Sequence, residues 1–232
     1  MTPKTPQQLT IDIYSDVMCP WCLIGYGQLT KALGELEGEI DAQIRWRPFE
    51  LNPQMPPEGE EQEAHLQRKY RRSAEDGAAI RGQMRAIAED AGVSLAYEGE
   101  GDPPPAMMWN TRDAHKLLGF ALEQAGPQAQ TELKLALFRA HFNERRNLGD
   151  RNVLLDIAAG VGLHREAAKA ALEDTELEAR VLAEERQAWD MNISGVPAMI
   201  VNGKFLIPGA QGPETYVNAL RRVAEKSRTG LS

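Results

Sequence analysis

Apolar and polar residues alternate with period two near both ends of the chain, a pattern typical of strands. Residues 9–14 alternate in this way, and residues 40–49 repeat the pattern. Near the C-terminus, two short apolar runs at 198–201 and 204–207 flank Asn202-Gly203. Asn-Gly between apolar runs favours a tight hairpin, because both central residues of a type I′ turn need a positive φ. We therefore expect two N-terminal strands and a C-terminal hairpin.

The middle of the chain has a different period. Between residues 58 and 189 apolar residues recur three and four positions apart, with almost no strand signal. Glycine and proline divide this region into predicted helices at 61–72, 78–91, 106–125, 128–143, 152–161, 164–172 and 174–192. A helix is also expected from Cys19 to near Gly38, and another from Pro213. The pattern indicates strand-rich ends with a helical segment between them.

The only two cysteines form the sequence Cys19-Pro20-Trp21-Cys22 at the start of the first predicted helix. Free N–H groups and the partial positive charge of a helix N-terminus favour a thiolate. We therefore expect Cys19 to be the nucleophile and the more exposed sulfur. Cys22 continues an apolar stripe with Tyr26, Leu29, Leu33 and Leu36, so we expect it to be the buried resolving thiol. Pro20 falls where a first-turn proline is tolerated.

Other roles for the cysteine pair have less support. A zinc site needs about four ligands, and the four histidines show no metal-binding spacing relative to the pair, so we expect no metal. A structural disulfide across so short a loop would restrain little of the unfolded chain. Redox exchange is the favoured interpretation, ahead of an inert or purely structural role.

Composition and charge exclude some classes of binding partner. The net charge of −8 argues against a nucleic-acid partner, and it gives no reason to expect an anionic membrane. No apolar stretch approaches membrane-spanning length, and residues 1–8 lack the apolar core of a secretory signal. We therefore expect a cytoplasmic location, where a lone Cys-X-X-Cys is typical of redox or metal chemistry.

The cysteine pair lies in the segment 15–25, Ser-Asp-Val-Met-Cys-Pro-Trp-Cys-Leu-Ile-Gly. Further motifs lie at 46–53, 110–115, 194–197 with Asn202-Gly203, and 209–211. These segments resemble the DsbA-like thioredoxin family, and specifically its FrnE-like branch. Together they run from near residue 11 to near residue 222. Cys-Pro-Trp-Cys followed far along the chain by Gly-Val-Pro is a specific combination.

The resemblance implies an α/β fold, a thioredoxin-like domain with a large inserted all-helical domain. Residues 1–56 and 190–232 would form the discontinuous thioredoxin-like domain, and residues 57–189 the insertion, which would cover the active-site face as a lid. The resemblance also implies a cis peptide bond between Val196 and Pro197, packed beside the disulfide. Substrate would then contact Pro20, Trp21, Val196 and Pro197. Well-known periplasmic members carry Pro-His between the cysteines; the neutral indole of Trp21 implies weaker oxidising power.

The leading functional hypothesis is therefore a thiol–disulfide oxidoreductase acting on protein or small-molecule thiols and disulfides. It needs no cofactor beyond the cysteine pair, although glutathione is a possible co-substrate. The alternative is a glutathione-dependent isomerase or transferase, similar to the 2-hydroxychromene-2-carboxylate isomerases or kappa-class transferases. Those proteins characteristically have serine where Cys19 stands. A non-enzymatic chaperone or redox sensor is a third possibility.

Three further features of the sequence have more than one interpretation. The basic run 68–72 is either an anion site, for example for glutathione carboxylates, or a solvated helix face, and the latter is favoured. His115 is either an acid–base group near the cleft or, as favoured, a packed interface residue. The helical region offers enough surface for a possible homodimer.

Overall fold

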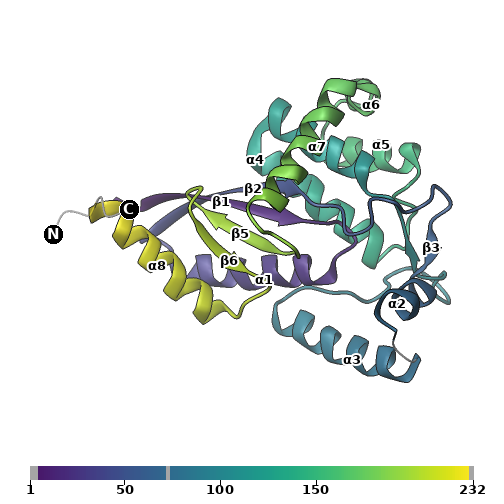
Figure 1. The fold of residues 1–232 in the computed structure, drawn as a ribbon, viewed down its shortest axis with the longest axis horizontal. Coiled ribbons are helices and arrows are strands. Elements are labelled where there is room, and N and C mark those ends of the chain that lie inside the picture. Colours follow the sequence, from purple (N-terminus) through teal and green to yellow (C-terminus); the bar gives the residue numbers. More distant parts are fainter. Residues whose placement is uncertain (1–4, 72–73, 230–232) are drawn as a thin grey trace.

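A computed structural model describes residues 5–71 and 74–229. A four-stranded sheet lies at its centre, in the order β2-β1-β5-β6 (Figure 1). β1 (Gln7–Ser15) pairs in parallel with β2 (Ile40–Pro48) and antiparallel with β5 (Ala198–Val201), which forms a hairpin with β6 (Phe205–Pro208). Asn202 and Gly203 both have positive φ in the hairpin turn, as the sequence predicts.

One face of the sheet is covered by the helices α1 (Pro20–Glu35) and α8 (Pro213–Thr229), which pack against each other. Alternation along β1 turns Leu9, Ile11 and Ile13 into this layer, where they meet Leu29 and Leu220. On the other face Tyr14 and Ile200 pack with Ala188, near the end of α7 (Thr175–Asp190). Both faces of the central strands are therefore buried.

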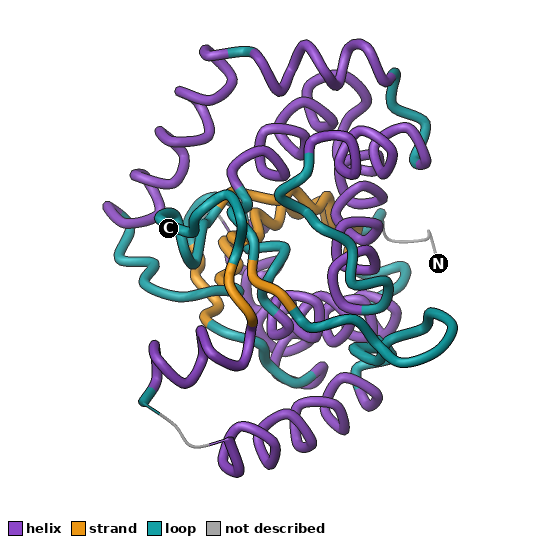
Figure 2. The backbone as a smooth tube through the Cα atoms, turned by 90° about the vertical axis from the view of Figure 1, so that its right-hand side faces the viewer, coloured by secondary structure: helices purple, strands orange, loops and turns teal. Residues whose placement is uncertain are grey.

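The inserted helices form two groups at the end of the sheet where α1 begins. α2 (Gln62–Tyr70) and α3 (Ala74–Asp90) lie on one side. The kinked helix α4 (Arg112–Phe142), α5 (Arg151–Gly160), α6 (Arg165–Glu173) and α7 gather on the other side (Figures 1 and 2). Two short strands, β3 (Glu60–Glu61) and β4 (Met107–Met108), pair next to the first group. The helices therefore surround the active-site end of the sheet.

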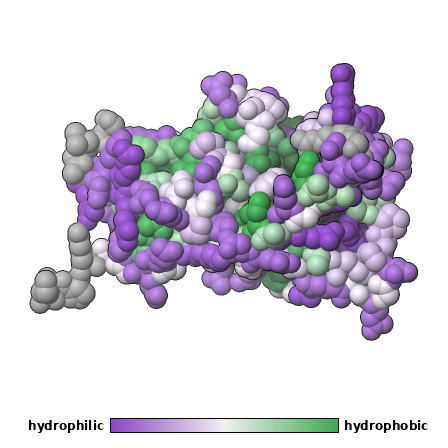
Figure 3. All heavy atoms as spheres, turned by 90° about the horizontal axis from the view of Figure 1, so that it is seen from below, coloured by the Kyte–Doolittle hydropathy of each residue, from purple (hydrophilic) through white to green (hydrophobic). Residues whose placement is uncertain are grey.

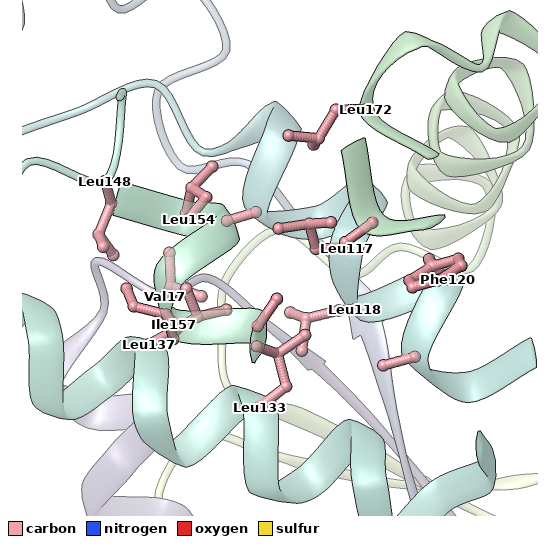
Figure 4. Packing of buried hydrophobic residues seen from close by; sticks show 14 of the residues in the cluster. Val17, Leu117, Leu118, Phe120, Leu133, Leu137, Leu148, Leu154, Ile157 and Leu172 are labelled. Carbon is pink, nitrogen blue, oxygen red and sulfur yellow. The ribbon is translucent and has the colours of Figure 1, made fainter. Parts of the chain in front are cut away.

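The core of the larger helix group reaches into the loop before the cysteines. Leucines of α4 pack against Leu154 and Ile157 of α5, and Val17 inserts its side chain among them (Figure 4). Val17 and Met18 belong to the β1–α1 loop, yet both are buried in this helical core. The position of the cysteine loop thus depends on the inserted helices as well as on the sheet.

Much of the predicted fold is confirmed, including the α/β class with a thioredoxin-like sheet and a helical insertion. The predicted helix 106–125 is wrong at its start, because Met107 and Met108 form β4 and the helix begins only at Arg112. The predicted break near residue 126 is a kink inside α4, where Gly126 adopts φ 84°. The split at residues 57 and 189 stays a prediction; Phe138 and Phe142 of α4 pack into the core of the sheet domain.

The face of the molecule seen from below Figure 1 has no continuous apolar surface. Figure 3 shows apolar side chains in separate patches with hydrophilic residues between them. Within the described residues, no helix is both long enough and apolar enough to cross a membrane.

Candidate functional site

The two cysteines occupy different depths at the start of α1. Cys19 is the N-cap residue, and Pro20 is the first residue of the helix, as expected. The Cys22 N–H donates to the Cys19 carbonyl at 3.1 Å, which closes the first turn over the pair. Both cysteines are free thiols; Cys19 is 5% exposed and Cys22 is 0% exposed. The prediction that Cys22 is the more buried sulfur is confirmed.

A cis peptide bond between Val196 and Pro197 faces Cys19. The Cys19 Sγ lies 3.7 Å from the Val196 carbonyl oxygen and donates a weak hydrogen bond to it. Gly25 allows α1 to lie close to Pro197, because a Cβ on residue 25 would lie 3.0 Å from Cγ of Pro197. The cis bond expected from the resemblance is confirmed. The roles of Val196 and Pro197 in substrate binding stay predictions.

The two thiols influence each other's titration. A hydrogen bond to Cys22, followed by burial, raises the pKa of Cys19 well above its ordinary value. Burial also acts to raise the pKa of Cys22, but the hydrogen bond from Cys19 and the charge of Lys134 outweigh burial and lower it. Within the pair, the higher pKa lies on Cys19 and the lower one on Cys22; a thiolate at Cys19 stays a prediction. One transfer along the S–H···S bond moves the charge to Cys19, so the first proton belongs to the pair.

Three ionisable side chains are buried around the pair. Asp16 accepts hydrogen bonds from the N–H groups of Met18 (3.1 Å) and Leu51 (2.7 Å), while burial raises its pKa. His115 lies with Nε2 4.0 Å from Oδ1 of Asp16, and burial lowers its pKa well below the usual value. Lys134 of α4 donates to the Ser15 carbonyl at 3.4 Å. The site therefore combines two thiols with a carboxylate, a neutral imidazole and an amine.

A pocket of about 340 Å³ opens beside Cys19, between the start of α1 and the helices α2 and α3. Pro20 and Trp21 line it, and Trp21 is 39% exposed. Most of its other walls are apolar, and they include Leu66, Ile80, Met84 and Met108. Cys22 is not part of the pocket wall. An incoming disulfide in this pocket therefore meets Cys19 first.

This geometry agrees with the comparison with known proteins. A model of the DSBA-like thioredoxin domain matches residues 10–221. The chain belongs to this family. It is 28% identical over 215 residues to the uncharacterised protein YwbO of Bacillus subtilis, covering 90% of this chain and 94% of YwbO.

Two solved structures have a similar overall fold. A probable DsbA oxidoreductase from Streptomyces coelicolor, SCO1869, superposes with a TM-score of 0.82 at 29% identity, covering 92% of this chain and 89% of that one. The cytosolic disulfide reductase DsbM of Pseudomonas aeruginosa, solved with GSH, has a TM-score of 0.58 at 19% identity, covering 93% of this chain and 99% of that one. The second likeness shows the shared fold.

Two residues of the basic run, Lys69 and Tyr70, line the pocket of this DsbA-like protein. Lys69 lines the pocket and donates to Asn52 Oδ1 (2.8 Å) and to the Leu51 carbonyl (3.2 Å). Arg68 is exposed and forms an ion pair with Glu60. Arg71 is also exposed, and Arg72 lies outside the described residues. Lys69 thus connects the loop after β2 to the pocket wall. Arg68 lies on a solvated helix face, as favoured from the sequence.

A second group of charged residues surrounds the loop after β2. Glu185 of α7 accepts from the Glu50 N–H at 3.0 Å, next to the Leu51 N–H that Asp16 binds. Arg112 pairs with the Glu50 carboxylate and, at 3.5 Å, with Glu178. Burial and then the charge of Glu50 raise the pKa of Glu185 to about 7. The inserted helices α4 and α7 therefore hold the loop that forms one wall of the site.

Sequence reasoning missed Asp16 and Lys134. Asp16 lies in the motif that carries the resemblance, but nothing in its local pattern distinguishes a buried carboxylate from a turn residue. Lys134 had a usable signal: it falls four residues after Gln130 and four before Phe138, on the buried stripe of α4. No three His, Cys, Asp or Glu side chains in the described part of the chain converge on a point that could hold a metal ion.

Proposed function

We propose that this protein exchanges disulfides with protein or small-molecule thiols through Cys19, with Cys22 as the resolving thiol. The observation that carries the proposal is the arrangement of the pair: Cys19 lines a pocket and contacts the carbonyl before the cis-proline, whereas Cys22 is fully buried and outside the pocket wall. Membership in a family of thiol–disulfide oxidoreductases supports the same chemistry.

The reaction takes place in two exchanges. The Cys19 thiolate attacks one sulfur of a substrate disulfide, the substrate S–S bond breaks, and one substrate thiolate leaves. Cys22, as a thiolate, then attacks the Cys19 sulfur of the mixed disulfide and expels the second substrate thiolate. The products are the Cys19–Cys22 disulfide and two reduced thiols. Run in reverse, the oxidised pair accepts two electrons from a substrate dithiol.

Glutathione is a proposed co-substrate. The pocket places Lys69 and Arg81 among apolar side chains within reach of Cys19, and cations of this kind suit the carboxylates of a small peptide thiol. The DsbM structure, solved with GSH, provides a precedent on the same fold. Action in the cytoplasm is part of the proposal, and the homodimer stays a prediction.

The decisive experiment equilibrates the protein against a glutathione series and traps the thiols for mass spectrometry. We expect a reversible two-electron couple near or above the cytosolic glutathione poise, roughly −220 to −320 mV depending on method. Cys22→Ser should accumulate a mixed disulfide at Cys19 with glutathione or a peptide disulfide, whereas Cys19→Ser should form none. Absence of a reversible Cys19–Cys22 disulfide would refute the proposal. In that case glutathione-dependent isomerisation by Cys19→Ser becomes the next assay.

A further inference from the structure

Lys134 occupies an unusual position for a lysine. Its side chain is fully buried, with an exposed fraction below 2%, although it belongs to an inserted helix. Its Nζ donates to the Ser15 carbonyl and lies 5.2 Å and 4.9 Å from the ring centres of Trp46 and Phe138. One carbonyl and two ring faces compensate a buried ammonium only in part, because burying a charge is costly without an opposite charge nearby.

The charges that face Lys134 come from three parts of the chain. Asp16 lies in the β1–α1 loop, Cys19 and Cys22 lie at the N-cap and in the first turn of α1, and His115 lies on α4 itself. Burial lowers the pKa of Lys134 to about 8, and negative charge at Cys22, then at Asp16, limits the fall. The influence is mutual, since the Lys134 charge lowers the pKa of Cys22. His115 stays neutral beside it, so the anions available to Lys134 in this group are the thiolate and the Asp16 carboxylate.

We propose that Lys134 is a positioning residue for the resolving thiol: its ammonium, held between Ser15, Trp46 and Phe138, keeps Cys22 as a thiolate and favours the reduced form of the pair. This inference rests on the proposed function. When the Cys22 thiolate attacks Cys19 of the mixed disulfide, the new S–S bond consumes the anion beside Lys134. The bond between Cys19 and the substrate breaks, and the substrate sulfur leaves with the electron pair and takes a proton from water. Lys134 then loses the thiolate charge that supports its own ammonium, which makes the disulfide form less favourable.

The physical consequence is a more oxidising cysteine pair. Lys134 stabilises the reduced state through the thiolate, whereas its own desolvation is present in both redox states, so the net effect favours the reduced pair. The lysine reaches the site only because α4 packs its C-terminal half, including Phe138, into the core around Cys22. The helical insertion thus provides a charge for the chemistry as well as a wall for the pocket.

The same helix offers a matched control. Lys116 is also buried, at 2% exposure, but its Nζ donates to the Leu172 carbonyl at 2.7 Å and pairs with Glu178 at 3.5 Å. These partners belong to α6 and α7, away from the cysteines. Lys116→Met removes a buried ammonium of the same kind from the same helix. It controls for loss of stability without altering the charge near Cys22.

The test compares Lys134→Met with Lys116→Met. The pKa of Cys22 is measured in a Cys19→Ser background by the ultraviolet absorbance of the thiolate across pH, and the Cys19–Cys22 equilibrium with glutathione is measured in the wild-type background. We expect Lys134→Met to raise the pKa of Cys22 and to shift the equilibrium at least tenfold toward the disulfide, equivalent to about 30 mV. Lys116→Met should change neither quantity, whatever its effect on stability.

A Cys22 pKa and an equilibrium constant within twofold of wild type in Lys134→Met would overturn the inference. If Lys134→Met does not fold, Lys134→Gln removes the charge with a polar side chain and must meet the same criteria. The two proposals fail in different ways. Without a reversible disulfide in the wild type the proposed function fails, while the Cys22 titration still decides whether Lys134 controls that thiol.

Discussion

Glu185 and Glu50 illustrate how single residues at the edge of the site depend on their surroundings. Both carboxyl groups are partly desolvated, and Arg112 pairs with Glu50. With a pKa of about 7, Glu185 is partly protonated in the folded protein at neutral pH. In the unfolded chain its pKa returns to near 4.5, so the folded state binds more protons between these two values. Glu185 therefore makes stability fall as the pH rises from about 4.5 through 7.

Replacing Glu185 with glutamine should remove the fall in stability that this carboxyl group causes as the pH rises. The Gln side-chain oxygen can still accept from the Glu50 N–H, but no charge forms above pH 7. We expect Glu185→Gln to raise the free energy of unfolding by about 1 kcal/mol at slightly alkaline pH, after discounting for solvent screening. The advantage should vanish as the pH falls toward 4.5. Urea denaturation at several pH values measures it.

The neighbouring carboxylate provides the control. Glu184 pairs with Arg47 at 3.2 Å, so Glu184→Gln breaks an ion pair and should lower stability at the same alkaline pH. An equal gain in both variants would show that the effect is a general response to the net charge of −8 and does not depend on the Glu50–Glu185 contact.

At the scale of elements, the packing of α1 depends on where its glycines lie. A Cβ on Gly27 would lie 2.6 Å from the carbonyl oxygen of Ala91 and 3.0 Å from Cγ1 of Val93. These atoms belong to the segment that leaves α3, so Gly27 permits the close approach of α3 to α1. A Cβ on Gly34 would meet nothing within 4 Å. The two glycines therefore differ in packing while sharing one helix.

Alanine substitution separates these two cases. Gly27→Ala forces the backbone of α1 away from the backbone at Ala91, and we expect it to lower the free energy of unfolding by about 1–3 kcal/mol. Gly34→Ala gains helix propensity without a clash and should raise it by up to about 1 kcal/mol. Chemical denaturation of both variants checks the prediction. Destabilisation by both, or by neither, would contradict the assigned contact between α1 and the end of α3.

For the whole molecule, the main question is whether the sheet and the inserted helices unfold together. Val17 of the cysteine loop lies in the helical core (Figure 4), and Phe138 and Phe142 of α4 lie in the sheet core. Each core thus contains residues from the other part of the chain. Such interlocking favours one cooperative transition over two independent ones.

Val17→Ala tests this cooperativity. Truncating a fully buried side chain should cost about 2 kcal/mol. We expect far-ultraviolet circular dichroism, which reports mainly the inserted helices, and fluorescence of Trp46 in the sheet core to shift by the same amount; Trp21, Trp109 and Trp189 are replaced by phenylalanine in both proteins so that the fluorescence reports Trp46. Denaturation curves that separate into two midpoints would show that residues 57–189 form an independent domain. The conservative variant Val17→Ile should retain a single midpoint.

The sequence by itself determined the features that depend on neighbouring residues. Period-two alternation located β1 and β2, Asn202-Gly203 located the hairpin, and the Cys19–Cys22 pair at a helix start identified the chemistry. The stripe on α1 also identified the more buried thiol. Sequence-based expectations were wrong where strand pairing with a distant segment outweighed the local pattern. At the predicted helix start at 106, Met107 and Met108 instead pair with Glu60 and Glu61.

Only the tertiary structure decided what surrounds the two sulfurs. Asp16 adjoins the cysteines in the chain, but His115 and Lys134 come from the distant helix α4, and these groups act on the thiols only after the helices pack around the end of the sheet. The pKa of a thiol depends on burial and on charges within a few ångströms, and neither quantity follows from helical or strand periodicity. For this reason the sequence predicted the identity of the cysteine pair, while the distribution of charge across it required the fold.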